Sequence, residues 1–503
     1  MAQTLFTLLI IGVVLAYSIW QGLKSENSSA DLQGFFLMNK SLHAKLLGTS
    51  FVASNISVAT VVLALGVVGY NFGFWGAVWI TICWILGIFL FAYLIGREPI
   101  HGYLSVGHTL HEFIGEQYDE PGRLPIVRLA ASALTIFVFW ATIGIEFFAA
   151  VIVFMKLGGG LSPMLMALLI ALAIIIYTMI GGYRAATVSD WPRLALVTTG
   201  FVILVAIAIW IQHKSTVAAE PLFSISAVAR VPPEWAIAGI FTLVPVQLSG
   251  MDMWQRCVAA NGDVPAIRRG LLFAVPLNLL WLVPAYVGAL AKTLNFQPTN
   301  VNHVVLEVLE RIEPFIGSWW GWAVRPLLYA SLVATMASVI DTLLMSLIFT
   351  FMYDMYGCFK KIDFSKLTKP EEAKMVIRAK YWTGLLGLSS LCVVFAGLIK
   401  ATIYDLIVTS FALQIILFSP VLLAVFARNR NLRKRRLAFA GLCAGFLAAV
   451  AAIVRFLVTQ DQRFLNGAPI AAIIVTFVIY LILVLSSPKR QVNVTGANNA
   501  ART

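Results

Sequence analysis

The chain has 503 residues, of which 60% are hydrophobic and only 12% are charged. Soluble globular proteins carry about 25% charged residues, so a water-soluble protein of this size could not bury so much hydrophobic surface. A net charge of +13 would suggest nucleic acid as the partner of a soluble protein. In a membrane protein it reflects the side of the bilayer on which the basic residues lie. We therefore expect an integral multi-pass membrane protein that contacts the lipid bilayer and no nucleic acid.

Hydrophobic blocks follow one another from end to end, which favours a single membrane transport domain over residues 1–503. The first block has no basic stretch before it and is long enough to cross the hydrocarbon, so it is interpreted as a span and not as a cleaved signal. Every span must be a helix, because an open sheet would leave backbone groups unsatisfied in lipid. About thirteen spans are predicted, at 3–22, 46–70, 74–96, 129–156, 163–181, 190–212, 235–254, 268–292, 320–356, 380–400, 403–426, 437–457 and 468–487.

The distribution of lysine and arginine predicts the orientation. If the N-terminus lies outside, the inner loops hold 27 of the 36 basic residues, as the positive-inside rule requires. We expect an outer N-terminus, a cytoplasmic tail at 488–503, and the plasma membrane as the location, which in a bacterium is the inner membrane. The sequence leaves the oligomeric state open.

Two predicted spans contain polar and helix-breaking residues that a lipid-facing helix does not need. Residues 50–60 read SFVASNISVAT, and residues 244–255 read VPVQLSGMDMWQ. Interrupted helices are tolerated in membranes where the freed backbone groups face protein or a watery cavity. The alternative is a pair of kinked, tightly packed helices. The two segments begin spans two and seven, as corresponding members of two inverted five-helix repeats would, so we expect a binding site at mid-membrane.

Residues 177–190 read YTMIGGYRAATVSD, which resembles the YTxxGGxxA…TD signature of the sodium:solute symporter family. That family includes sodium/glucose, proline and pantothenate cotransporters. Four further segments are similar in order and spacing: 53–56, 109–128, 255–260 and 331–356. The resemblance covers roughly residues 35–435 and implies a LeuT-type fold. Its ten-helix core would span 46–426, with one extra span at 3–22 and two extra spans within 437–487.

The resemblance also implies where sodium binds. The family pattern assigns sodium to the backbone carbonyls of Ala53 and Ile56 and to hydroxyls on the eighth core helix. Ser338 stands at the first of two adjacent hydroxyl positions, but Val339 stands at the second. Thr335 lies one turn before Ser338 and is expected to complete the oxygen shell that a hard cation needs.

Two aspartates leave the coupling ion open. The resemblance implies that Asp341 stands where some relatives assign a hydroxyl to a second sodium, and that Asp190 matches an acidic residue of the fifth core helix. They form a candidate second cation site or, if the two carboxylates approach each other, a proton site. The alternative is that each aspartate pairs with a nearby arginine or caps a helix.

The substrate candidates surround the first helix break, where the amide of Asn55 both donates and accepts hydrogen bonds. Glu146 is mid-span, where an ionised carboxylate is costly, so it must be protonated, paired or facing the central cavity, and the cavity is favoured. Relatives that carry sugars have an acidic residue where this chain has Trp79, so an amino acid, a carboxylate or an amide is favoured over a sugar. Asp252 and Arg256 are expected to form an ion pair within one helix. The full set of substrate candidates is Asn55, Ser57, Trp79, Glu146, Gln247 and Gln414.

The sequence therefore predicts a secondary active symporter that couples sodium to the uptake of a small organic solute. Alternatives are a proton-coupled symporter of the same fold, a transporter-like sensor, and a uniporter or channel. No phosphate-binding loop or hydrolase motif supports an ATP-driven pump or an enzyme. His101, His108 and His111 are expected to lie on a solvated inner segment and not to bind a metal, and the five cysteines predict no disulfide.

Overall fold

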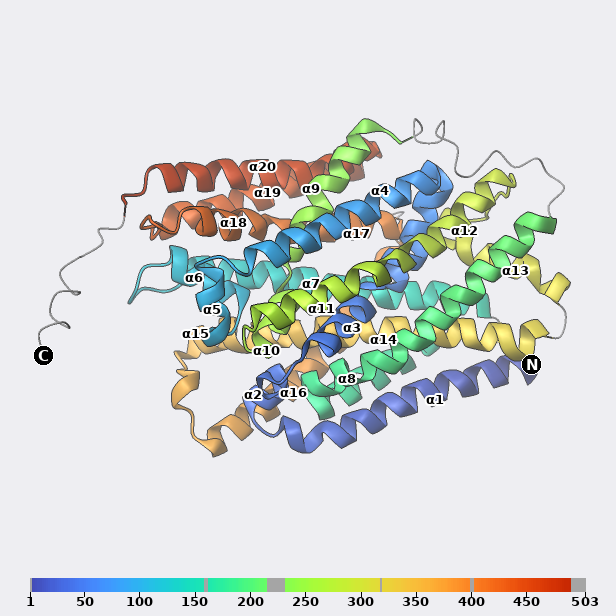
Figure 1. Cartoon of the computed structure of the whole chain (residues 1–503), viewed down its shortest axis with the longest axis horizontal. Coiled ribbons are helices and arrows are strands. Elements are labelled where there is room, and N and C mark those ends of the chain that lie inside the picture. The colour runs from blue at the N-terminus through green and yellow to red at the C-terminus, as the bar shows by residue number, and fades with distance from the viewer. Residues whose placement is uncertain (1, 158–161, 215–230, 317–318, 399–401, 490–503) are drawn as a thin grey trace, which may run out of the picture.

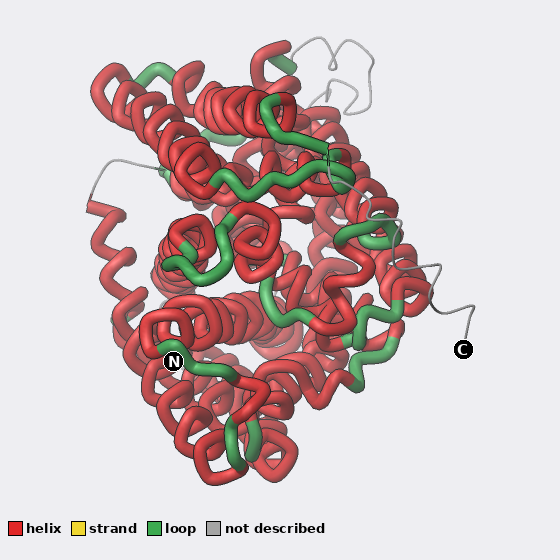
Figure 2. The backbone as a smooth tube through the Cα atoms, turned by 90° about the vertical axis from the view of Figure 1, so that its left-hand side faces the viewer, coloured by secondary structure: helices red, strands yellow, loops and turns green. Residues whose placement is uncertain are grey.

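The computed structural model describes residues 2–157, 162–214, 231–316, 319–398 and 402–489, so nearly all of the predicted tail 488–503 lies outside the described residues. Every regular element in the described part is a helix, apart from one isolated bridge between Arg430 and Lys489. Most helices run along the long axis of the molecule (Figure 1), so the turned view looks down many of them end on (Figure 2). This all-helical architecture agrees with the sequence prediction.

Among the described residues, ten helices are long and hydrophobic enough to cross a membrane. The prediction of about thirteen spans is therefore not confirmed by helix length and composition. The long helices and the segments that continue them are α1 (Ala2–Ser25), α3 (Ala44–Asn55), η3 (Val58–Ala64), α4 (Leu65–Leu94), α7 (Ile126–Leu157), α8 (Pro163–Lys214), α9 (Pro233–Ser249), α10 (Met251–Ala259), α11 (Val264–Leu277), α12 (Leu282–Thr293), α14 (Arg325–Thr350), η8 (Phe351–Tyr356), α16 (Lys369–Ser389), α17 (Ile403–Gln414), α18 (Phe418–Phe426), α19 (Arg435–Thr459) and α20 (Gln462–Leu485).

Helix α8 is two helices joined at Gly182, whose φ of +58° favours glycine. The guanidinium of Arg193 donates a hydrogen bond to the hydroxyl of Tyr177 at 2.6 Å. Sixteen residues of straight helix would span about 24 Å, so the chain must fold back between these residues. The turn coincides with the glycine pair of the signature motif. Gly73, with φ +76°, interrupts α4 in a similar way.

Both predicted helix interruptions are present. Between α3 and η3 the backbone is extended at Ile56 and Ser57, and between α9 and α10 it is extended at Gly250. Helix α14 lies at the centre of the bundle, where 94% of the most hydrophobic window of its span is buried, and it packs against α1, α3, α7 and α8. The first break therefore lies next to the most buried of the ten candidate spans in the described part of the chain.

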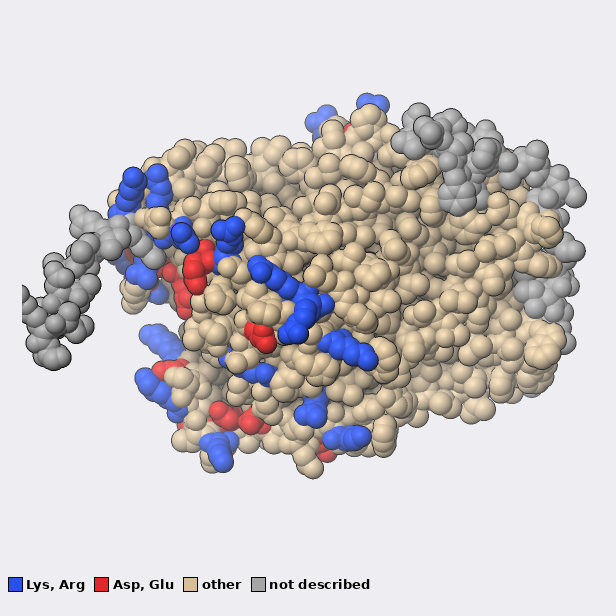
Figure 3. All heavy atoms as spheres, in the orientation of Figure 1, with Lys and Arg blue, Asp and Glu red and all other residues tan. Residues whose placement is uncertain are grey.

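The charged residues are distributed unevenly over the surface. In Figure 3, Lys and Arg side chains gather toward the end of the molecule that carries α2 (Leu32–Leu37), α5 (Ile100–Val106), α6 (Leu110–Tyr118) and α15 (Gly357–Lys360). The N-terminus lies at the opposite end (Figure 1). Most of the face between them is uncharged, as a lipid-facing surface requires.

Candidate functional site

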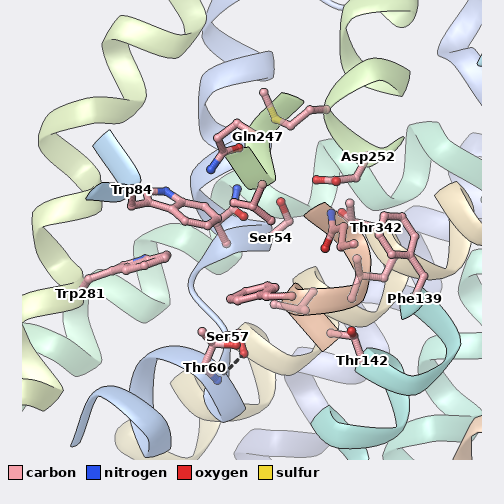
Figure 4. A pocket seen from close by; sticks show the side chains of 17 residues that line it. Ser54, Ser57, Thr60, Trp84, Phe139, Thr142, Gln247, Asp252, Trp281 and Thr342 are labelled. Carbon is pink, nitrogen blue, oxygen red and sulfur yellow. Dashed lines mark hydrogen bonds between the residues drawn. The ribbon is translucent and has the colours of Figure 1, made fainter. Parts of the chain in front are cut away.

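A cavity of about 700 Å³, including the part that opens outward, lies beside the first helix break. Its lining combines aromatic side chains with hydroxyl, amide and carboxyl groups (Figure 4), and the lining residues come from nine helical elements of the bundle. Four of the predicted substrate residues line it: Asn55, Ser57, Gln247 and Gln414. The lining residues that were not among the substrate candidates include Ser54, Thr60, Trp84, Phe139, Thr142, Asp252, Trp281, Thr342 and Phe411.

The amide groups in this cavity differ in how free they are to bind a solute. Asn55 donates from Nδ2 to the carbonyl of Phe51 at 2.6 Å, which leaves mainly its carbonyl oxygen for a solute. Gln247 is buried, and its Nε2 has no hydrogen-bond partner among the described residues. Because an unpaired buried donor is costly, Gln247 is the amide most ready to bind a polar ligand.

Glu146 is buried behind Ser57 and, contrary to expectation, does not line the cavity. The hydroxyl of Ser57 donates to Oε1 of Glu146, and the amide of Ala59 approaches the same oxygen at 3.3 Å. Ser57 in turn accepts from the amide of Thr60 at 2.8 Å. The carboxyl group therefore sits at the N-terminal end of η3, where free backbone amides favour negative charge.

Trp79 is also outside the cavity. Its indole donates to the carbonyl of Ala236 at 2.9 Å and so ties α4 to α9. This cavity gives the prediction of Trp79 as a substrate residue no support. Helix α4 is hydrophobic on every side, so the sequence does not indicate which of its faces turns inward. In this structure the residue holds two helices together.

The predicted ion pair between Asp252 and Arg256 is present, with 2.9 Å between Oδ2 and Nη1. Arg256 is fully buried and also donates to the hydroxyl of Ser54, so it ties α10 to the last turn of α3. Asp252 turns its carboxylate toward the cavity (Figure 4). The available signal was its place directly after the break at Gly250, where polar groups of an interrupted helix face a site.

A second, more hydrophobic cavity adjoins the first and shares Thr60, Trp281 and Phe411 with it. It is lined by Tyr404 of α17 and by Asn466 of α20. Their side chains lie within hydrogen-bond distance of each other, at 3.3 Å. Helix α20, expected as an extra flanking span, thus helps to line a cavity next to the site.

The side of the break that faces α14 carries oxygen atoms suited to a cation. Helix α3 ends at Asn55, so the carbonyls of its last turn, including that of Ala53, lack the amide partners of a continuous helix. The hydroxyl of Ser338 is buried and has no hydrogen-bond partner among the described residues. Thr335 donates to the carbonyl of Ser331 at 2.7 Å, which leaves its lone pairs free to bind an ion.

Asp190 is fully buried on α8, with the hydroxyls of Ser50 and Ser338 beside its carboxylate. Neither carboxylate oxygen makes a hydrogen bond of good geometry within the described part of the chain. A carboxylate in this state needs a cation or a proton, because a buried unpaired charge is very costly. The oxygen-rich surroundings fit sodium, a hard cation.

Asp341 is paired instead. Arg193 Nη1 lies 2.6 Å from Asp341 Oδ2 and 3.9 Å from Asp190 Oδ1. Its Nη2 donates to the hydroxyls of Tyr177, at 2.6 Å, and Ser18, at 2.8 Å. The sequence left open an acidic pair or an arginine partner for each aspartate, and in the structure Arg193 lies close to Asp341 and farther from Asp190. We call Asp190, Arg193, Ser338 and Asp341 the α8–α14 cluster.

A second charged cluster lies at the end of the molecule that carries α5 and α6. Asp354 of η8 accepts from the hydroxyl of Thr109 at 2.7 Å and from Nε of Arg128 at 2.8 Å, and its other oxygen lies 2.9 Å from Nδ1 of His111. Nε2 of His111 reaches the hydroxyl of Thr135 at 2.8 Å. We call Thr109, His111, Arg128 and Asp354 the α6–η8 cluster.

The expectation that His111 lies on a solvated segment was wrong, because the residue is fully buried. Its partner Asp354 lies more than 200 residues away in the chain, so local sequence could not reveal the pairing. Nearby, burial disfavours the ionised form of Glu112, but a hydrogen bond with His108 and the charge of Arg128 outweigh it and lower the pKa of Glu112 to about 2.

Comparison with known proteins places this geometry in context. A family model described as the sodium:solute symporter family matches residues 35–445. The uncharacterized symporter YidK of Escherichia coli strain K12 is 28% identical over 329 residues, which cover 60% of this chain and 55% of that protein. The match thus spans little more than half of the relative's length.

Among solved structures, a Na+-coupled sialic acid symporter in a substrate-bound outward-open state matches with a TM-score of 0.72 and 14% identity, over 97% of this chain and 99% of the other. The nucleobase-cation-symport-1 family transporter MHP1, in a closed conformation with bromovinylhydantoin bound, matches with a TM-score of 0.50 and 13% identity, over 91% of this chain and 96% of the other. At these identities the likeness concerns the fold alone.

Proposed function

The chain belongs to the sodium:solute symporter family, and from this premise we propose that it couples inward sodium movement to the uptake of a small polar organic solute. The proposed architecture is a LeuT-type core of two inverted five-helix repeats over residues 46–426, within a single domain of about thirteen spans. The N-terminus lies outside and the C-terminus inside, and the location is the plasma membrane, or the inner membrane of a bacterium. The basic residues gathered at one end of the molecule support this orientation.

We propose that sodium binds between the last turn of α3 and the middle of α14. The observation that carries this assignment is the set of buried, unpaired oxygens of Asp190 and Ser338. The carbonyls of Ala53 and Ile56 and the hydroxyl of Thr335 complete the shell. Asp190 supplies the oxygen that Val339 cannot, since a carboxylate is a ligand of hard cations.

The proposed solute binds on the other side of the same break, against Asn55, Ser57, Gln247 and Gln414, with Asp252 at the edge. Glu146 already occupies the free amides at the start of η3, where a substrate carboxylate would otherwise bind. The carboxylate of Asp252 is already paired with Arg256, so it offers no free charge to an ionic solute. Within the class of amino acids, carboxylates and amides, these two groups favour a neutral solute that carries amide groups. Trp84, Trp281 and Phe411 offer aromatic faces to its apolar part.

Coupling follows from the shared helix break. The ion joins α3 to α14 on one side, and the solute contacts Asn55 and Ser57 on the other. Each ligand therefore stabilises the same local conformation and lowers the ordering cost that the other pays. By linkage, sodium must raise solute affinity by the factor by which the solute raises sodium affinity.

The test is a thermal-shift screen of purified protein against amides, amino acids, carboxylates, ureas and sugars, in sodium and in choline buffers. A ligand that binds the native state raises its apparent stability. We expect an amide to raise Tm in sodium and to do so much less in choline. The best ligand is then supplied to proteoliposomes with an inward sodium gradient, where we expect accumulation above equilibrium that collapses with the gradient.

The same measurements separate the alternatives. Accumulation driven by a pH gradient without sodium would assign the coupling to protons. Sodium-dependent binding without accumulation would assign the chain to sensors, and uptake that never exceeds equilibrium would assign it to uniporters or channels. Each of these three results would overturn sodium symport.

A further inference from the structure

Arg193 is a fully enclosed cation in the membrane-spanning part of the protein. Only 2% of its surface is exposed, and neither carboxylate beside it is exposed at all. Its guanidinium contacts Asp341, Tyr177 and Ser18 at 2.6–2.8 Å and lies 5.0 Å from the centre of the Tyr177 ring. A guanidinium stays protonated at any accessible pH. The site therefore holds a permanent positive charge.

The charges of the α8–α14 cluster do not balance. Two buried carboxylates, Asp190 and Asp341, face one guanidinium, which leaves one negative charge. The neighbouring pair of Asp252 and Arg256 is neutral by itself. Because buried charge must be compensated, the cluster calls for one monovalent cation and not two. The oxygens left without partners belong to Asp190 and Ser338, so that cation has its place on the Asp190 side.

We propose that Arg193 is a tethered cation that fills the Asp341 side of the acidic pair, so that the protein binds a single sodium ion, on the Asp190 side. This inference rests on the proposed sodium coupling and deepens it. Arg193 then occupies the candidate second ion site permanently, and each chain binds one sodium ion.

The position of Arg193 is built by three elements. Tyr177 and Arg193 lie on the two arms of α8, which the turn at Gly182 brings together. Ser18 comes from α1, the helix before the proposed core, and Asp341 from α14. Helix α1 thus helps to hold the internal cation, which gives this extra helix a role in ion specificity.

The test is equilibrium binding of 22Na+ to the purified full-length protein, with sodium alone as the probe. We expect one sodium per wild-type chain and a Hill coefficient near one. In Arg193→Gln, the freed Asp341 needs a new partner, so we expect a second sodium per chain. Arg193→Lys keeps the charge and should bind one.

Asp341→Asn provides a second test, which does not require that the protein still folds when Arg193 is replaced. Without Asp341, Arg193 is free to pair with Asp190, already 3.9 Å away, and the cluster is neutral. We expect sodium affinity to fall at least tenfold. If Asp341 were instead a ligand of a second sodium, this variant would lose one ion of two and keep the other.

The outcomes separate this inference from the proposed function. Two sodium ions per wild-type chain would overturn the tethered cation and leave sodium coupling intact. No sodium binding to the wild type would overturn both. One ion in folded Arg193→Gln, or undiminished affinity in Asp341→Asn, would overturn the tethered cation alone.

Discussion

The two buried charged clusters of this protein differ in how completely their oxygens are paired. In the α6–η8 cluster, each carboxylate oxygen of Asp354 meets at least one donor within 2.9 Å. In the α8–α14 cluster, neither oxygen of Asp190 makes a hydrogen bond of good geometry with a described residue, although the hydroxyls of Ser50 and Ser338 lie beside the carboxylate. A network with every partner present stabilises a structure, whereas a network with missing partners indicates a ligand site. Burial of charge alone does not distinguish the two clusters, because both contain fully buried carboxylates.

The difference also explains what each cluster joins. Asp354 ties η8, which continues α14, to α6 and to the start of α7, and it does so without any ligand. Asp190 stands between α3 and α14, two elements whose contact would be completed by an ion. We therefore interpret the α6–η8 cluster as a fixed joint and the α8–α14 cluster as an ion-dependent one.

The largest effect should come from breaking the fixed joint. Arg128→Met removes the cation beside Asp354 and leaves a buried carboxylate with less compensation, which typically costs about 3–5 kcal/mol. We expect a clear fall in Tm, measured by thermal unfolding of the purified protein, with unchanged 22Na+ affinity in the folded fraction. Arg435→Met, at a looser pair 3.9 Å from Glu120, is the matched control and should lower Tm much less. A loss of sodium affinity in Arg128→Met would contradict the division into fixed and ion-dependent joints.

The next effect should appear in ion binding and not in stability. Asp190→Asn removes the only uncompensated carboxylate of the α8–α14 cluster, so we expect sodium affinity to fall on the order of 100-fold, about 2.7 kcal/mol. Without sodium, Tm should not fall, because the variant no longer buries an unpaired charge. Asp363→Asn, in an exposed turn, is the control. The assignment fails if Asp190→Asn binds sodium as the wild type does.

The sequence predicted the parts of this comparison that local pattern determines. Polar and helix-breaking residues predicted both interruptions, because a membrane tolerates them only beside protein or a cavity. The motif resemblance predicted the family, and with it the likeness of Asp190 to an ion-site residue. The four substrate candidates that line the cavity are near a break or on a helix that faces it.

What the sequence could not predict depends on contacts between distant segments. The sequence offered a nearby arginine as the alternative partner of each aspartate. It did not indicate that Arg193 lies closer to Asp341 than to Asp190, because that contact depends on the turn at Gly182. Glu146 was assigned to the cavity because a carboxyl group in a span needs a polar environment, yet backbone amides of a neighbouring break supply it. Asn466 lines the second cavity, next to the site, but it lies on α20, a helix that contains none of the motifs.

A smaller effect should distinguish two hydroxyls of α14. Among the described residues Ser338 has no hydrogen-bond partner of good geometry, whereas Thr335 donates to the backbone of its own helix. Ser338→Ala removes a free ligand, so we expect the sodium concentration for half-maximal binding to rise about tenfold, equal to 1.4 kcal/mol. Thr335→Ala should raise it by a smaller factor. The 22Na+ binding curve measures both, and equal effects, or none in either variant, would count against the proposed shell.

The smallest effect concerns the edge of the fixed joint and depends on pH. The pKa of Glu112 is lowered from 4.5 to about 2, so its ionised form stabilises the fold. This contribution is fully present above pH 4.5 and is lost as the pH falls toward 2. We expect Glu112→Gln to lower Tm at pH 7 by the equivalent of about 1 kcal/mol, with the difference from wild type shrinking below pH 4.5.

For Glu116, one turn further along α6, we expect the opposite effect of substitution on Tm. Burial and the charge of Glu112 raise its pKa, so its ionised form is less favourable in the folded state and opposes folding at neutral pH. Glu116→Gln should therefore raise Tm slightly at pH 7, and the gain should fade as the pH falls and the wild-type side chain becomes protonated. If both variants lowered Tm equally at every pH, the effect would be a general loss of helix contacts. Opposite signs on one short helix would instead show that the pairing of Glu112 with His108 and Arg128 stabilises this end of the molecule.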